Sequence, residues 1–165
     1  MVKELRPSGI KSISRIPWGT HFGFFYHTQT ELFKIVVPYI KAGLGNNEYC
    51  LWITSSPEES ARAQAELRKV VDWDKYARNN QIEIRDYRNW YLTAKKIQPA
   101  AVLKKWLQKT ADARRRGFAG IRVTSATSWM RDKDWPKFSR YEREINENIA
   151  GKNILLLCSY RLGRQ

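Results

Sequence analysis

The residues of this chain that could do chemistry gather where short apolar segments end. His27 follows the aromatic segment 21–26, and Tyr160 closes an apolar run near the C-terminus. An imidazole donates or accepts a proton near neutral pH, and a phenol joins an apolar ring to a polar tip. The hydroxyl-rich segment 124–128 leads into Trp129, a combination that could clasp a small organic molecule. Candidate ligand contacts at these ends are Tyr26, His27, Thr124, Ser125, Trp129 and Tyr160.

Each candidate also has a packing alternative. A histidine at a strand end can simply bond a loop carbonyl, and tyrosines there also occur at interfaces. Trp129 could serve only as an anchor for its loop. Glu142 lies beside Tyr141 on the inward side of a helix, where it is either a buried hydrogen-bond partner or an exposed neighbour of Arg140 and Arg143. These alternatives stay open at the level of sequence.

The sequence lacks the motifs of nucleotide hydrolysis and covalent catalysis. The segment after 21–26 has neither the glycines nor the lysine of a phosphate-binding loop, and no acidic residue follows Thr124 and Ser125 to hold magnesium. There is no GxGxxG or GxSxG pattern. Cys50 and Cys158 lie in apolar runs without CxxC spacing, as small core residues do. We therefore expect a protein that is not an enzyme, with no cofactor and no metal site.

Length and charge limit the possibilities further. The 165 residues (19.4 kDa) suffice for one domain of ordinary size. No apolar run reaches the roughly 18 residues of a membrane helix, and a secretory signal is absent, so we expect a cytoplasmic location.

The net charge is +14, and half of it arises between Lys95 and Arg116. Such a segment suits nucleic acid or merely a solvated helix face. The residues for a nucleic-acid interface would be Lys104, Lys105, Lys109, Arg115 and Arg116.

Strands and helices alternate along the chain. The expected strands are 21–26, 48–54, 81–86, 120–125 and 153–160, with helices at about 28–43, 56–70, 99–116 and 136–149. We expect Gly43 and Gly45 to end the first helix, and irregular loops at 87–98 and 126–135. Uninterrupted apolar strands joined by helices predict an α/β three-layer sandwich with a mainly parallel five-stranded sheet. Ligands bind such sheets at the carboxyl ends of the strands.

Short motifs spread over the whole chain resemble one known family. They include His21-Phe-Gly-Phe-Phe-Tyr26, Glu48-Tyr-Cys-Leu-Trp52-Ile, Ser128-Trp129, Tyr141-Glu142 and Leu157-Cys158-Ser-Tyr160. In this order they resemble MEDS domains, the methanogen/methylotroph dichloromethane-regulator sensory domains. The likeness covers about residues 18–162. It divides the chain into a basic N-terminal extension, 1–17, and a single domain, 18–165.

The resemblance implies a sensory module of signalling or transcription-regulating proteins that recognises hydrocarbon derivatives. It also implies a RecA-like core that lacks the phosphate-binding loop. The family-like positions of the implied site are His21, Tyr26, Thr28, Glu31, Arg122, Ser128, Trp129, Glu142 and Tyr160.

A non-enzymatic sensor of a small organic or methylated molecule is therefore the leading hypothesis. Its output partner would be a histidine kinase or a transcription regulator. A nucleic-acid-binding module and a degenerate nucleotide-binding pseudo-ATPase domain are the alternatives. Trp90, Tyr91 and Trp135 could be core, pocket or homodimer contacts.

Overall fold

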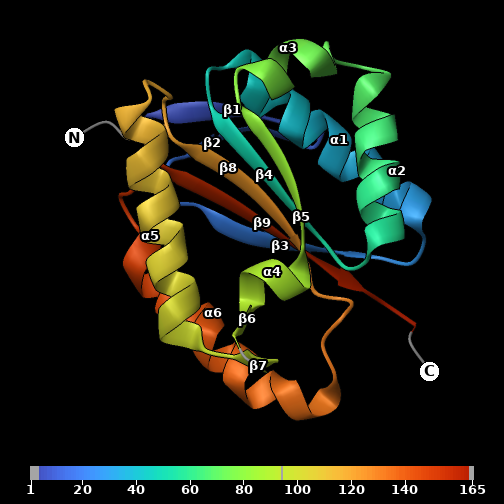
Figure 1. The fold of residues 1–165 in the computed structure, drawn as a ribbon, viewed down its shortest axis with the longest axis vertical. Coiled ribbons are helices and arrows are strands. Elements are labelled where there is room, and N and C mark those ends of the chain that lie inside the picture. The colour runs from blue at the N-terminus through green and yellow to red at the C-terminus, as the bar shows by residue number, and fades with distance from the viewer. Residues whose placement is uncertain (1–3, 94, 164–165) are drawn as a thin grey trace.

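Five parallel strands form the central sheet of the computed structural model, which describes residues 4–93 and 95–163 (Figure 1). Their order is β3-β9-β8-β4-β5, with every neighbouring pair parallel. The bounds are β3 (His21–Tyr26), β4 (Tyr49–Thr54), β5 (Ile82–Asp86), β8 (Ile121–Ala126) and β9 (Ile154–Arg161). All five expected strands are confirmed. Strand β5, whose apolar residues alternate with charged ones, lies at an edge of the sheet.

Helices cover both faces of the sheet. One face carries α1 (Gln29–Gly45), α2 (Pro57–Arg68) and α3 (Trp73–Arg78), and the other carries α4 (Tyr87–Tyr91), α5 (Pro99–Arg115) and α6 (Trp135–Ile149). Each face has its own apolar core, and every residue of β4 and β8 is buried. Two-sided cover explains the uninterrupted apolar runs of the central strands. The expected three-layer sandwich is confirmed. None of the described helices has the length and hydropathy to cross a membrane.

The basic N-terminal segment contains an antiparallel hairpin of β1 (Leu5–Ile10) and β2 (Ile13–Pro17). The hairpin packs on α1 and contributes Ile10 and Ile16 to the core on that face. Gly9 makes the close approach possible, because its φ is 78° and a Cβ atom there would collide with the carbonyl oxygen of Pro38. The hairpin is therefore part of the packed structure.

Of the two glycines expected to end the first helix, Gly45 is the last residue of α1, with Asn46 as its C-cap, whereas Gly43 lies within the helix. Two other local expectations were wrong. The segment 87–98 is not an irregular loop, because Asp86 caps α4 and a small hairpin of β6 (Leu92–Thr93) and β7 (Lys96–Ile97) follows. Between β8 and α6 lies a short 3-10 helix, η1 (Asp132–Asp134). Elements of two to five residues are too short to show a hydrophobic period.

Candidate functional site

A pocket of about 270 Å³ opens at the carboxyl edge of the sheet, where β3 and β9 end beside η1. Phe25, Trp135 and Leu162 line it, and these are three of the large apolar side chains that remain exposed, at 69%, 43% and 42%. The ring of Phe25 lies 5.6 Å from that of Tyr160. Exposed apolar side chains that converge on one hollow mark a binding site more often than scattered ones do. The polar wall comes from Thr127, Ser128, Asp132 and Arg161.

Sequence analysis named two residues of this pocket, Ser128 and Tyr160, and missed most of the others. Phe25 and Met130 were not among the candidates, since one looked like an ordinary strand residue and the other like a loop residue. Trp135 was left open as a core, pocket or homodimer contact, and it lines the pocket. Phe25 could have been found from its position on an edge strand, where the residue pattern 21, 23, 25 faces away from the α1 side.

Trp129 lies outside this pocket. Its ring stacks on Tyr87 at 4.5 Å and 10°, and its indole N–H donates to the carbonyl oxygen of Ala126 at 2.8 Å. Tyr91 is a second aromatic neighbour, with ring centroids 5.3 Å apart. These contacts hold Trp129 as an anchor of the loop after β8. Its remaining surface lines a separate hollow of about 370 Å³ with Lys95 and other residues.

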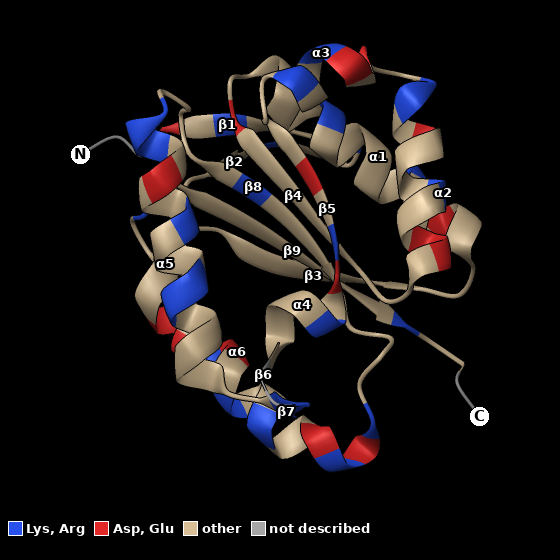
Figure 2. Ribbon diagram, in the orientation of Figure 1, with Lys and Arg blue, Asp and Glu red and all other residues tan. Residues whose placement is uncertain are grey.

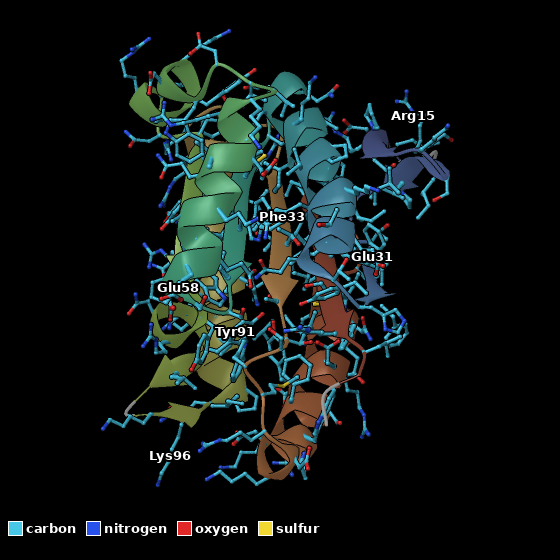
Figure 3. All side chains as sticks on the ribbon, turned by 90° about the vertical axis from the view of Figure 1, so that its right-hand side faces the viewer. Arg15, Glu31, Phe33, Glu58, Tyr91 and Lys96 are labelled. Carbon is cyan, nitrogen blue, oxygen red and sulfur yellow. The ribbon has the colours of Figure 1, made fainter. Side chains whose placement is uncertain are left out.

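The residues that follow β3 are engaged in starting α1. Glu31 lies in the first turn of α1 (Figure 3). The hydroxyl of Thr28 accepts from the backbone N–H of Glu31 at 3.2 Å, and the Glu31 carboxylate accepts from the N–H of His27 at 2.8 Å. The two bonds form a variant of the capping box, in which the carboxylate reaches the N–H of the residue before the cap. The bond to the His27 N–H lowers the pKa of Glu31. A carboxylate thus occupies the helix N-terminus where a phosphate-binding loop would hold an anion. Tyr26 is buried in the core on the α1 face, away from the pocket.

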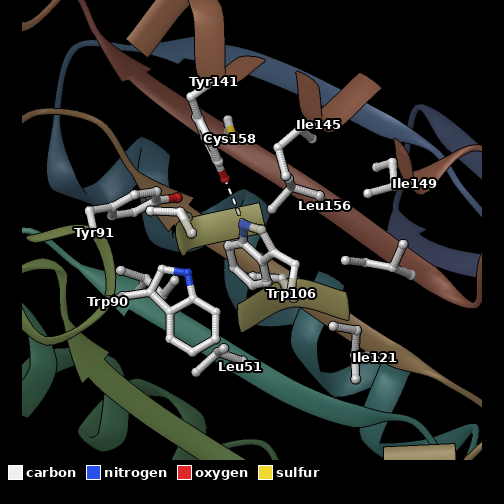
Figure 4. Packing of buried hydrophobic residues seen from close by; sticks show 14 of the residues in the cluster. Leu51, Trp90, Tyr91, Trp106, Ile121, Tyr141, Ile145, Ile149, Leu156 and Cys158 are labelled. Atoms are coloured by element: carbon white, nitrogen blue, oxygen red, sulfur yellow. Dashed lines mark hydrogen bonds between the residues drawn. The ribbon is translucent and has the colours of Figure 1, made fainter. Parts of the chain in front are cut away.

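Thr124 and Ser125 are buried beneath the sheet edge. The Ser125 hydroxyl bonds the phenol of Tyr91 at 2.6 Å. Tyr91 packs edge-on against Tyr141, whose hydroxyl accepts from the indole N–H of Trp106 at 2.7 Å (Figure 4). Burial raises the pKa of Tyr91 and of Tyr141 well above the ordinary value. None of these side chains lines the pocket at the ends of β3 and β9.

A second polar cluster lies on the α6 side of strands β3 and β9. Nδ1 of His21 lies 2.7 Å from the amide oxygen of Asn146, and its Nε2 lies 3.4 Å from the Cys158 thiol and 3.3 Å from the Glu142 carboxylate. Burial raises the pKa of Glu142 to about 7, lowers that of His21 and raises that of Cys158. Among the described residues, these are the ones whose donor atoms could converge on a metal ion. The cluster thus brings the mostly buried Glu142 carboxyl group next to the His21 imidazole and the Cys158 thiol.

The residues proposed for a nucleic-acid interface are largely engaged within the protein. Lys105 donates to the carbonyl oxygen of Trp90, Lys109 pairs with Glu83 at 2.7 Å and Arg115 pairs with Asp112. Arg116 donates to the carbonyl oxygens of residues 79 and 80, and Lys104 is exposed. Figure 2 shows acidic residues among the basic ones on α5 and around η1. These contacts occupy the head groups of four of the five basic side chains, while the net charge of the protein stays the same.

Arg122 has a structural position at the opposite end of β8. All five of its N–H groups are used, two by Glu48 and three by the carbonyl oxygens of Pro7, Ser8 and Tyr39. Both Arg122 and Glu48 are fully buried. Arg6 adds a second cation to the same carboxylate at 2.8 Å. The residue therefore ties the hairpin to the core and does not reach the pocket.

The all-parallel sheet, its two helical layers and the capped helix after β3 define an α/β domain with a RecA-like core and no phosphate-binding loop. The chain matches the MEDS family, the methanogen/methylotroph, DcmR sensory domain, over residues 20–164, and it belongs to that family. A KaiC-like protein from the hyperthermophilic archaeon Pyrococcus horikoshii OT3 has a similar fold, with a TM-score of 0.67 and 15% identity over 97% of this chain and 71% of the other. No curated protein sequence matches the chain. The suspected family and RecA-like core are thus confirmed.

Proposed function

We propose that this sensory domain detects a small, mostly apolar organic molecule in the pocket between Phe25, Trp135 and Tyr160. The carrying observation is the convergence there of three exposed apolar side chains, Phe25, Trp135 and Leu162. A ligand would cover them and gain the free energy of removing apolar area from water. A volume of about 270 Å³ suits a molecule of few heavy atoms. Hydroxyl groups of Thr127 and Ser128 would orient it.

The pocket is placed where binding could be transmitted. Met130 and Trp135 lie on the connection from β8 to α6, and Trp135 is the first residue of that helix. A ligand that packs on both side chains favours one arrangement of η1 and of the start of α6. A signalling partner, such as a histidine kinase or a transcription regulator, would read that arrangement.

The test is a thermal-unfolding shift with dichloromethane, chloroform, toluene and trimethylamine, with ATP and a short DNA duplex as arms for the alternative functions. A compound at about a hundred times its dissociation constant adds about 2.7 kcal/mol, which in a domain of this size raises Tm by roughly 5–10 °C. Phe25→Ala and Trp135→Ala should each weaken binding at least about tenfold, because each removes a wall of apolar contact.

Leu5→Ala is the matched control, since Leu5 is an exposed apolar side chain in the hairpin, at 46% exposure. It should bind the same compound as tightly as the unchanged protein. Equal affinity in Trp135→Ala and the unchanged protein would refute the site. A shift with ATP would favour the pseudo-ATPase alternative, and a shift with DNA that disappears as salt rises would favour the nucleic-acid alternative.

A further inference from the structure

We propose that His21, Glu142 and Cys158 form a binding site for one divalent transition-metal ion of the zinc class. The three residues come from β3, α6 and β9, and none is close to another in sequence. Each offers one ligand atom, and these atoms all lie within 4.8 Å of one another. The site lies apart from the organic-ligand pocket, so it does not depend on the function proposed above.

The two separations measured from the histidine fit tetrahedral zinc. Zinc bonds of about 2.0–2.1 Å to nitrogen, 2.3 Å to sulfur and 2.0–2.2 Å to oxygen place N and S about 3.6 Å apart and N and O about 3.4 Å apart. From Nε2 of His21, the observed distances are 3.4 Å to the Cys158 sulfur and 3.3 Å to Oε2 of Glu142. All three donor atoms lie within 4.8 Å of one another, so adjustment of the side chains could bring them onto one ion.

Asn146 orients the histidine for metal binding. Its amide oxygen lies 2.7 Å from Nδ1 of His21, so it accepts the ring proton there. The lone pair of Nε2 then points toward Cys158 and Glu142. Ligand histidines in metal sites are held in this way by a polar partner on the other ring nitrogen.

The Glu142 carboxyl group supplies the second observation. Its Oε2 atom is the oxygen that lies 3.3 Å from Nε2 of His21, and its other oxygen, Oε1, is buried and has no hydrogen-bond partner among the described residues. A buried oxygen without a partner is costly, and a cation that bonds Oε1, together with Oε2 or in its place, removes that cost. Zinc with one thiolate, one carboxylate and a neutral imidazole carries no net charge, which suits a largely enclosed position. The thiolate ligand favours zinc over magnesium or calcium.

The site has room for exchange with solvent. The side chain of Glu142 is 21% exposed and that of His21 is 7% exposed, whereas Cys158 lies inside the core (Figure 4). Three protein ligands leave a fourth tetrahedral position for water or a small ligand. Metal binding would replace the thiol proton of Cys158 and any proton on Glu142, both of which pass to solvent.

The experiment titrates the purified full chain with Co²⁺, which takes the zinc geometry and reports a thiolate ligand through its charge-transfer absorption. We expect one Co²⁺ per chain, displaced by one equivalent of Zn²⁺ and not by excess Mg²⁺. Cys158→Ala should abolish the charge-transfer band. Glu142→Gln, which keeps the side-chain shape, should weaken Zn²⁺ binding at least about tenfold, and Asn146→Ala about 10–100-fold.

Cys50→Ala is the matched control, because Cys50 is the other buried free cysteine of the described chain. It should keep both the band and the affinity, as should Trp135→Ala, which separates this test from that of the organic ligand. Circular dichroism of each variant without metal checks folding, and Glu142→Gln decides the matter if Cys158→Ala does not fold. The proposal is overturned if the unchanged protein binds no Co²⁺, or if the band survives Cys158→Ala or Zn²⁺ affinity survives Glu142→Gln.

Discussion

Replacing Arg122 by methionine should make the protein unfold at a markedly lower temperature than the unchanged chain. Arg122 lies fully buried in β8 and bonds the equally buried Glu48 carboxylate at 2.5 and 3.1 Å. It also donates to the carbonyl oxygens of Pro7 and Ser8, which belong to the N-terminal hairpin, and of Tyr39 in α1. Arg122→Met removes the charge and the five hydrogen bonds that these acceptors receive from it.

The magnitude follows from the burial of the pair. Removing one partner of a buried ion pair costs about 3–5 kcal/mol, because the other charge stays in a medium of low dielectric constant. Arg6 moderates the loss, since its Nε lies 2.8 Å from Glu48 and remains after the substitution. In a domain of this size, about 3–5 kcal/mol corresponds to a drop in Tm of roughly 6–20 °C. We expect Arg122→Met to reach at least the lower limit.

Urea and thermal unfolding measure the loss of global stability, and limited trypsin digestion measures how readily the hairpin detaches from the core. Because two of the lost bonds end on the hairpin, cleavage after Lys11 or Arg15 should accelerate below the unfolding temperature. The matched control is Arg115→Met, whose ion pair with Asp112 is exposed and should change stability by no more than about 0.5 kcal/mol. A loss of less than about 1 kcal/mol in Arg122→Met would refute the structural role.

Two further predictions concern α1 and α2. Gly43→Ala should destabilise the protein although alanine has the better helix propensity, because the added Cβ would lie 2.6 Å from Arg122 and 2.8 Å from Cys50. In Gly45→Ala the added Cβ meets nothing within 4 Å, so this variant should be neutral or stabilising in thermal unfolding. Equal effects of the two substitutions on Tm would contradict this. Burial raises the pKa of Glu59, so its contribution to stability is present below the ordinary glutamate pKa and is lost as pH rises through the folded value. Glu59→Gln should therefore raise the free energy of unfolding in urea at pH 8 and change it little near pH 4, and a variant less stable than the unchanged protein at pH 8 would contradict this.

The sheet was predictable from the sequence because its strands are buried on both faces. Segments such as Leu51–Ile53 and Leu155–Leu157 are fully buried, and such runs leave few other structures open. The hairpin at residues 5–17 could not be found this way. Of the hairpin residues, Ile10 and Ile16 join the apolar core on the α1 face of the sheet, and the polar Ser8 beside them is also buried. Its attachment depends on Arg122, which lies more than a hundred positions away.

The same limit applies to the sites. Sequence patterns placed Ser128 and Tyr160 near the strand ends, where parallel sheets bind ligands. His21 and Cys158 are 137 positions apart, and only the pairing of β3 with β9 brings them together. Gly43 was expected to end a helix, since a glycine there also serves as a cap. In the structure it makes room for Arg122, a reason visible only in the packed interior.

Helix α6 carries residues of both proposed sites, which gives a physical route between them. Trp135 lines the organic-ligand pocket, and Glu142 lies two turns further along, about 10 Å along the axis. If α6 moves as a unit, a ligand that displaces the start of the helix would also change how Glu142 faces His21. A metal that holds Glu142 to β3 would in turn fix the start of α6. Because coupling between two binding sites is reciprocal, an organic ligand that tightens metal binding must itself bind more tightly to the metal-loaded protein.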